Sequence, residues 1–214
     1  MRLYPFVSGQ YYHVYNRGVD KRIVFLRYGH YRRFTTTIDT ILKTGSATPR
    51  LTYNQSLALK LKVEIIAYAL MPNHYHFLIK QLMDDGITEF MHKLDTSYTK
   101  YINLNLRRTG RLFENTFKAK RLENDEMFLH VARYIHLNPV IARLVPSLEL
   151  WPWSSYLETI GKREKSFCHA QEILQHFSVQ NPSRAYEEFV TDQRKYAQLL
   201  HDADDVKDED MLFL

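Results

Sequence analysis

Two strand-like runs joined by only three residues limit the folds open to this chain more than any other feature. Residues 62–70 (KVEIIAYAL) and 74–80 (HYHFLIK) are dominated by aliphatic, β-branched and aromatic side chains, and Met71-Pro72-Asn73 separates them. A connection this short that contains Pro and Asn is typical of a tight turn, which pairs the flanking strands antiparallel. The sequence therefore predicts a β-hairpin, and the rest of the chain must complete its sheet.

The segments on either side of the hairpin add strands and helices. Residues 11–16 (YYHVYN) have the composition of a strand, and 115–122 could supply a fourth one. Apolar residues recur at three- and four-residue intervals over 28–43, where Gly45 is expected to end a helix, and again over 87–102. These patterns predict two amphipathic helices that alternate with the strands.

The boundaries of the next helices follow from capping residues and breakers. The helix over 87–102 is expected to end near Gly110. Asn124 or Asp125 could cap a further helix that runs to about Asn138, where Pro139 should break or kink it. This additional helix follows the fourth strand.

The order β-α-β-β-α-β predicts an α+β fold of the ferredoxin-like type, with a four-stranded antiparallel sheet covered by two helices on one face. In that topology the first and third strands are central, which places His74 and His76 in the middle of the sheet. We expect a main domain over 1–150, an α-helical appendage over 151–201 with helices near 170–177 and 183–196, and an acidic, disordered tail over 202–214.

Cysteine content and hydropathy exclude several classes of protein. Cys168 is the only cysteine, which excludes a disulfide-stapled scaffold and a Cys-rich zinc site. The opening residues contain no apolar run of signal-peptide length, and no stretch is long and apolar enough to span a membrane. We therefore expect a soluble, cytoplasmic protein without a membrane partner.

The charge distribution is consistent with nucleic acid binding. The net charge is +5, and because residues 202–210 are mostly acidic, the remainder of the chain is more basic than this value indicates. Basic residues recur beside aromatic ones, a mixture that suits single-stranded nucleic acid; the alternative is a solvated surface over an aromatic core. The candidate DNA-binding residues are Arg17, Lys21, Arg22, Arg107, Arg108, Arg111, Lys118 and Lys120.

His74-Tyr75-His76 is the clearest candidate for metal binding. Side chains at positions i and i+2 of a strand point to the same face, so both imidazoles would project together while Tyr75 faces the other side. Two histidines could share a divalent ion with a third ligand from elsewhere, or they could simply hydrogen-bond on a polar sheet face. Of the other histidines, only His130 and His136 lie near a candidate site, and His13 is expected to be a strand residue and not a ligand.

The helix around Tyr134 is a second candidate for chemistry. Positions 130, 134 and 138 lie one turn apart, so His130, Tyr134 and Asn138 share a face. An amide oxygen suits a hard cation such as Mg²⁺ or Mn²⁺ more than zinc. Alternatively, Tyr134 is a core residue and Asn138 only marks the end of the helix.

Four segments resemble the signature blocks of one family. The strings YHVYNRG, ALMPNHYHFLI, RYIHLNPVIARLV and WPWSSY, in this order between residues 11 and 156, are similar to those of the REP-associated tyrosine transposases. These belong to the IS200-like single-tyrosine transposases with a His-hydrophobic-His (HUH) motif. Tyr75 is the central residue of that motif here.

The resemblance implies a metal-dependent endonuclease and strand transferase that acts on single-stranded, hairpin-forming repeat DNA. It implies His74 and His76 as ligands of Mg²⁺ or Mn²⁺, Asn138 as the third ligand, and Tyr134 as the nucleophile that forms a 5′-phosphotyrosine. One phosphodiester replaces another, so rejoining would need no ATP.

Other functions remain open at this point. A domesticated relative could bind hairpin DNA without cutting it, and replication initiators or conjugative relaxases use the same two-His motif. An RNA-recognition-type sheet is a third alternative, but the chain lacks the Lys/Arg-Gly-Phe segment such a sheet requires. The sequence leaves both a monomer and a homodimer open.

Overall fold

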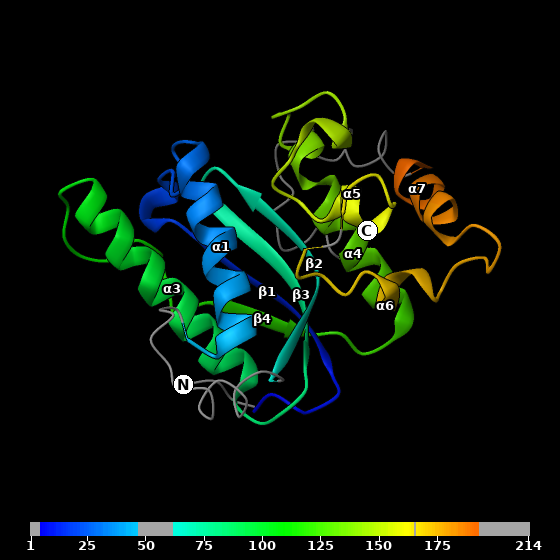
Figure 1. The fold of residues 1–214 in the computed structure, drawn as a ribbon, viewed down its shortest axis with the longest axis horizontal. Helices are drawn as coiled ribbons and strands as arrows, with labels where there is room; N and C mark the ends of the chain where they lie inside the picture. The colour runs from blue at the N-terminus through cyan, green and yellow to red at the C-terminus, as the bar shows by residue number, and fades with distance from the viewer. Residues whose placement is uncertain (1–4, 47–61, 165, 193–214) are drawn as a thin grey trace.

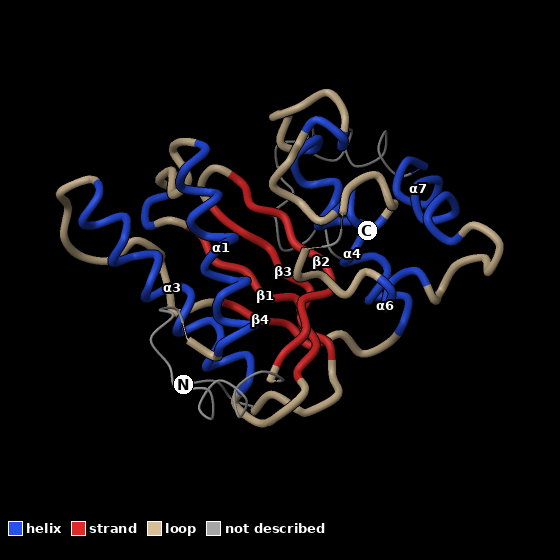
Figure 2. Tube along the Cα trace, viewed as in Figure 1, coloured by secondary structure: helices blue, strands red, loops and turns tan. Residues whose placement is uncertain are grey.

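Four antiparallel strands form the centre of the molecule. The computed structural model describes residues 5–46, 62–164 and 166–192. The strands β1 (Tyr11–Arg17), β2 (Val63–Met71), β3 (His74–Gln81) and β4 (Lys118–Arg121) form one sheet in the order β2-β3-β1-β4 (Figure 2). This confirms the predicted α+β class, with the first and third strands at its centre.

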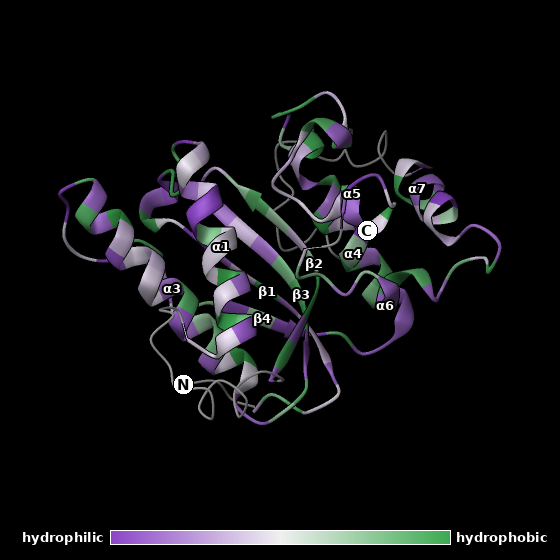
Figure 3. Ribbon diagram, viewed as in Figure 1, coloured by the Kyte–Doolittle hydropathy of each residue, from purple (hydrophilic) through white to green (hydrophobic). Residues whose placement is uncertain are grey.

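Two long helices, α1 (Tyr28–Thr44) and α3 (Gly86–Asn105), cover one face of this sheet (Figure 1). Hydrophobic and hydrophilic bands alternate along both helices in Figure 3, as expected of amphipathic helices. Their apolar stripes pack with the side chains that β1 and β3 direct to that face, and Tyr75 and Phe77 are fully buried there. A short 3-10 turn, η1 (Val19–Lys21), follows β1.

Gly45 ends α1 as predicted. It adopts the left-handed conformation, with a φ of 70°, and its N–H donates to the carbonyl of Ile41 at 2.7 Å. The predicted end of α3 near Gly110 is wrong, because the helix stops at Asn105. Arg107 takes the left-handed position (φ 49°), which lets the Arg108 N–H donate to the Asn103 carbonyl at 2.9 Å. A non-glycine C-cap of this type leaves no signature in the sequence.

The helix α4 (Asp125–Ile141) packs on the opposite face of the sheet, against β2 and β3. Its N-cap is Asn124, whose side chain accepts a hydrogen bond from the Met127 N–H at 2.8 Å. The predicted break at Pro139 is wrong, because the helix runs on to Ile141. Proline removes one backbone donor, and so close to the C-terminus of a helix the loss affects only the last turn.

The fourth strand is shorter than the predicted range 115–122. The Asn16 side-chain amide donates to the carbonyls of Asn115 and Thr116, at 3.0 Å each. These carbonyls are therefore held by a side chain, and the ladder with β1 begins only at Lys118.

The chain after α4 packs against the β2 edge and α4. The Leu70 N–H donates to the Trp153 carbonyl at 2.9 Å, and Ala69 and Ser154 form an isolated bridge. The helices here are short: η2 (Leu148–Leu150), α5 (Tyr156–Thr159), α6 (Gln171–Leu174) and α7 (Pro182–Asp192).

Two of these short helices differ in length from the predictions. The helix expected over 170–177 is a single turn, α6, because the amides of His176 and Phe177 bond three residues back in a tighter turn. The helix expected over 183–196 is described as α7 to Asp192, and the acidic tail over 202–214 lies outside the described residues. Across the three described ranges, no helix combines the length and apolarity needed to cross a bilayer.

Candidate active site

The two histidines of the HYH segment lie at the start of β3, which is one of the two central strands of the sheet. In the β1–β3 ladder, His74 is opposite Arg17 and His76 is opposite Tyr15. The His74 and His76 rings are 4.9 Å apart between centroids, at 86° to each other. Tyr75 points to the other face, where its hydroxyl donates to the Asp95 carboxylate at 2.8 and 2.9 Å. The alternation predicted from the strand period is therefore present.

Tyr134 reaches the histidine pair from α4. The phenol ring lies 5.4 Å from the His76 ring between centroids, with the two planes at 83°. Tyr134 is only 8% exposed, and it belongs to the hydrophobic cluster between α4 and the sheet. Residues 76 and 134, far apart in sequence, thus lie side by side within one chain.

Asn138 and His130 lie one helical turn from Tyr134 in opposite directions along α4. Asn138 is buried, and its amide nitrogen has no hydrogen-bond partner among the described residues. His130 bonds instead to Arg133, with 2.8 Å between its Nδ1 and the guanidinium, and lies 3.9 Å from the Glu126 carboxylate. Asn138 thus offers a buried, unpartnered amide one turn from Tyr134, while the His130 ring contacts Arg133 and Glu126.

The His76 imidazole is suited to be an electron-pair donor. Burial holds the pKa of His76 well below its usual range, and the neighbouring His74, His13 and Arg17 lower this pKa further. The ring is therefore neutral at pH 7, the form that ligates a metal. Its Nε2 is buried and has no hydrogen-bond partner in the described part of the chain.

The side chains that could ligate a cation beside His76 include an amide as well as imidazoles. Within the ranges that the structure describes, no group of three or more His, Cys, Asp or Glu side chains could hold a metal. Two imidazoles and the Asn138 amide are the ligands that the family resemblance implies, and the Nε2 of His76, which has no partner in the described residues, fits a bound cation. An amide in place of a thiolate or a third imidazole favours a hard cation.

His13 is a site residue that the sequence reasoning missed. It is 1% exposed, and its Nε2 lies 2.9 Å from Nδ1 of His76. Burial, together with the charge of Lys120, lowers the pKa of His13 to about 3, so this ring is also neutral. The alternation along β1 is the signal that could have found it. Once β1 pairs with β3, His13 must share a face with His76.

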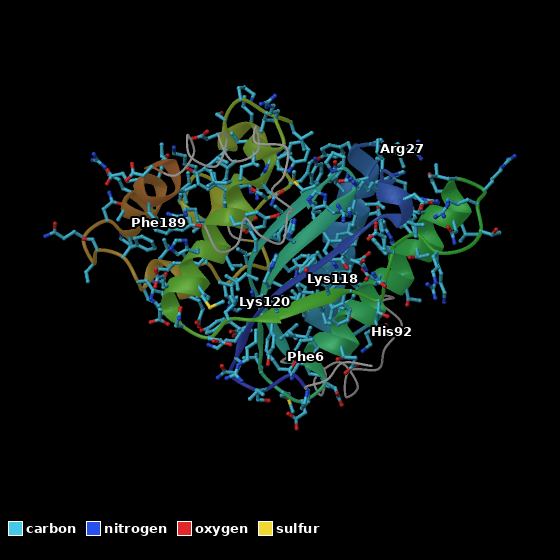
Figure 4. The ribbon with its side chains drawn as sticks, turned by 180° about the vertical axis from the view of Figure 1, so that it is seen from behind. Phe6, Arg27, His92, Lys118, Lys120 and Phe189 are labelled. Atoms are coloured by element: carbon cyan, nitrogen blue, oxygen red, sulfur yellow. The ribbon has the colours of Figure 1, made fainter. Side chains whose placement is uncertain are left out.

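Three predicted DNA-binding residues lie around the histidines. Lys118 and Lys120 are exposed on the edge strand β4, opposite Tyr15 and His13, and Figure 4 shows them on the side of the sheet seen from behind. The Lys118 ammonium lies 5.7 Å from the centroid of the Tyr15 ring. Arg17 forms an ion pair with Glu114 at 3.6 Å. Cations therefore border the histidine pair on the β4 side.

A second group of predicted cations lines a separate open hollow beyond the end of β1. This hollow is lined by Lys21, Arg22, Arg108 and Arg111, together with Asp20 and Glu114. Arg107 is exposed at the end of α3 and does not line it. Because Glu114 also pairs with Arg17, the hollow adjoins the cations beside the histidines.

His136 does not join the site. It is fully buried on the other side of α4, where its Nδ1 lies 2.7 Å from the Tyr186 hydroxyl and its Nε2 lies 2.8 Å from Ser155 Oγ. The guanidinium of Arg133 also lies 4.3 Å from the centroid of the Phe189 ring, which Figure 4 labels on α7. These contacts attach the helix that carries Tyr134 to the C-terminal segment.

Comparison with solved structures shows a similar fold. One such structure is described as the REP-associated tyrosine transposase bound to a REP hairpin. The chains share 18% sequence identity with a TM-score of 0.58, and the match covers 76% of this chain and 85% of that one.

A comparison with protein families identifies the family to which the chain belongs. No curated protein matches the chain significantly. Residues 9–138 match the family model described as "Transposase IS200 like". This range contains His13, His74, His76, Tyr134 and Asn138, and it covers more than half of the 214 residues. The chain belongs to the IS200-like transposase family.

Proposed function

We propose that this protein is a metal-dependent endonuclease and strand transferase that acts on single-stranded, hairpin-forming repeat DNA in the cytoplasm. One observation carries the proposal: the Tyr134 phenol from α4 packs against the His76 ring, whose Nε2 is buried and has no partner in the described part of the chain. A nucleophile and a cation-binding nitrogen on one sheet face match the needs of phosphoryl transfer.

The chemistry proposed for Tyr134 is a reversible exchange of phosphodiesters. Its phenol oxygen forms a bond to phosphorus while the bond from phosphorus to the 3′ oxygen breaks. The phenol loses a proton and the departing oxygen gains one, which leaves a 5′-phosphotyrosine and a free 3′-hydroxyl. A 3′-hydroxyl can then attack the phosphotyrosine and release Tyr134. One phosphodiester replaces another at each step, so no ATP is consumed.

His74, His76 and Asn138 are the residues proposed to hold Mg²⁺ or Mn²⁺. When bound, such an ion supplies charge that favours the phenolate form of a tyrosine and stabilises the negative charge that develops on phosphate oxygens. The protein keeps the His76 ring neutral by burial, as its lowered pKa shows. The His76 ring therefore needs to lose no net proton at pH 7 in order to ligate an ion.

The surface beside β4 is proposed to hold the DNA. Lys118, Lys120 and Arg17 border the histidines, and the hollow lined by Lys21, Arg22, Arg108 and Arg111 continues from Glu114. Lysine and arginine neutralise phosphates, so these side chains suit the backbone of a single strand. We propose residues 1–150 as the catalytic domain and 151–201 as an appendage, with a complete site in each chain.

A covalent-adduct assay tests this proposal. A labelled hairpin oligonucleotide with single-stranded flanks is incubated with the protein and Mn²⁺, and the products are separated under denaturing conditions. We expect a protein–DNA complex that EDTA abolishes. Tyr134→Phe should abolish the complex while DNA binding is retained, since only the phenol oxygen is removed.

Tyr28→Phe is the matched control, because Tyr28 is exposed at the start of α1 and packs on Trp153, away from His76. Binding of the hairpin with no adduct in any variant would instead identify a hairpin-binding module that does not cut. An adduct that persists in EDTA would refute the role of the ion.

A further inference from the structure

The contact between His13 and His76 is an in-plane hydrogen bond between two imidazoles. The facing atoms, His13 Nε2 and His76 Nδ1, are 2.9 Å apart. The ring planes differ by only 11° and the centroids are 5.1 Å apart, which is the separation of two coplanar rings joined edge to edge. Both rings are buried, with His13 1% and His76 3% exposed. A bond of this geometry contains one hydrogen, supplied by one of the two facing nitrogens.

The position of that hydrogen decides what His76 presents at its other nitrogen. A neutral imidazole carries one N–H and one lone pair. If His76 donates from Nδ1, its Nε2 is a bare lone pair; if His13 donates from Nε2, then Nε2 of His76 carries a proton and cannot ligate a cation. The outer nitrogens of the pair, His76 Nε2 and His13 Nδ1, are both buried and both lack a hydrogen-bond partner in the described residues. Either tautomer therefore leaves one buried N–H unpaired within the protein, and only the first leaves His76 Nε2 able to ligate a cation.

We propose that His13 is a positioning residue that accepts the hydrogen bond from His76 Nδ1–H and so keeps the Nε2 lone pair of His76 available to a cation. This inference rests on the ion site of the proposed function. It assigns a role to a residue of β1 that lies outside the His74-Tyr75-His76 segment. Partners of this kind fix the tautomer and the orientation of a ligating ring.

The same residue also orients the phenol. The Tyr134 ring stands nearly perpendicular to both imidazoles, at 83° to His76 and 85° to His13, with centroids 5.4 and 6.1 Å away. The two coplanar imidazoles therefore form a single surface, and the Tyr134 ring packs against both of them. Loss of His13 would remove its contact with the Tyr134 ring and also the hydrogen bond that orients the His76 ring.

Two variants separate hydrogen bonding from packing. His13→Gln retains an acceptor oxygen near the position of Nε2, whereas His13→Phe retains a ring but offers no acceptor. We expect His13→Phe to weaken Mn²⁺ binding, measured by calorimetry without DNA, by about 10- to 100-fold. His13→Gln should stay much closer to the wild-type affinity. Equal losses in the two variants, both of them folded by circular dichroism, would overturn the proposal.

The tautomer itself can be measured in the metal-free protein. Two-dimensional ¹⁵N–¹H spectra of the imidazole rings distinguish a proton on Nδ1 from one on Nε2. We expect His76 to carry its proton on Nδ1, and a proton on Nε2 would overturn the proposal. This readout does not depend on metal or DNA. Failure of wild-type protein to bind Mn²⁺ would count against the proposed function, while the tautomer would still decide the role of His13.

Discussion

Replacing His136 by leucine tests whether the helix that carries Tyr134 is anchored by buried hydrogen bonds. His136 bridges the Tyr186 hydroxyl and Ser155 Oγ, and all three residues are fully buried. Leucine fills much of the same space but offers no polar atom. The substitution therefore leaves a buried hydroxyl at Tyr186 without the imidazole nitrogen it bonds in the wild type.

The expected cost follows from the two lost bonds. A buried polar group left unsatisfied costs about 1–3 kcal/mol, which applies to the Tyr186 hydroxyl. Ser155 Oγ still accepts from the Tyr68 N–H at 2.9 Å, so the loss of its bond to His136 costs only about 1 kcal/mol. The free energy of unfolding should therefore fall by about 2–4 kcal/mol at pH 7.

The stability difference between the wild type and His136→Leu should also depend on pH. Burial lowers the pKa of His136 from 6.5 to about 3, so in the wild type its contribution is fully present above pH 6.5 and is lost as the pH falls towards 3. Each unit of pH below 6.5 costs the wild type up to about 1.4 kcal/mol. The leucine variant lacks this titration, so the stability gap should shrink by about 2 kcal/mol between pH 7 and pH 5.

Urea denaturation followed by tryptophan fluorescence at pH 7 and pH 5 measures both quantities. His92→Leu is the matched control, because His92 is exposed on α3 and its loss should change the stability by no more than about 0.5 kcal/mol. A His136→Leu variant as stable as this control at pH 7, or a gap that does not shrink at pH 5, would refute the reasoning.

Three further perturbations follow from single features of the structure. Asp95 is half-buried, and desolvation raises its pKa from 3.8 to about 7, so its stabilising contribution is present at low pH and is lost as the pH rises through 7. Between pH 4 and pH 7 the wild type should therefore lose stability relative to Asp95→Asn, by up to about 1.4 kcal/mol per pH unit, and parallel urea titrations check this. Gly86→Ala would place a Cβ 2.3 Å from the Lys62 carbonyl oxygen and should lower the free energy of unfolding by about 1–3 kcal/mol. Its control, Gly29→Ala in α1, meets open space and should leave the melting temperature unchanged or raised. Removal of the Lys118 and Lys120 side chains should weaken single-stranded DNA binding and reduce the slope of log binding constant against log salt concentration by about 0.7 for each lost phosphate contact. Lys43→Ala on α1 should leave this slope unchanged. Equal slopes for the two variants in fluorescence anisotropy would contradict the assignment of the β4 face.

The sheet and its long helices could be predicted because apolar residues repeat regularly along each element, every second residue in a strand and every three or four residues in a helix. The alternation through His74-Tyr75-His76 and the three- and four-residue intervals over 28–43 both reflect burial of one face. The ends of elements depend on local hydrogen bonds that sequence patterns do not specify. Arg107 replaces the expected glycine at the end of α3, and Pro139 lies inside α4.

The candidate site could be predicted only in part, because it depends on pairing between distant strands. His74, His76 and Tyr134 are found from spacing and from the family resemblance, and the structure brings the Tyr134 ring to the His76 ring. His13 needs the β1–β3 register, which places it diagonally from His76. The basic residues divide into two groups through contacts such as the Arg17–Glu114 ion pair, which no local pattern indicates.

Tyr15 is a second phenol close to the same imidazole. Its ring lies 5.9 Å from that of His76 and is nearly parallel to it, at 28°, whereas Tyr134 meets His76 edge-on. Tyr15 projects from the sheet itself, stacks on the His13 ring with 4.8 Å between centroids, and has the Lys118 ammonium 5.7 Å from its ring centroid. We therefore assign bond formation to Tyr134, and Tyr15 is the alternative that must be tested.

Peptide mass spectrometry of the protein–DNA adduct distinguishes these two tyrosines directly. Trypsin releases Tyr134 in the peptide 134–143 and Tyr15 in the peptide 3–17. After incubation with hairpin DNA and Mn²⁺, followed by nuclease and trypsin digestion, we predict a 5′-phosphonucleotide on peptide 134–143. The modification on peptide 3–17, or on any residue other than Tyr134, would contradict the central claim.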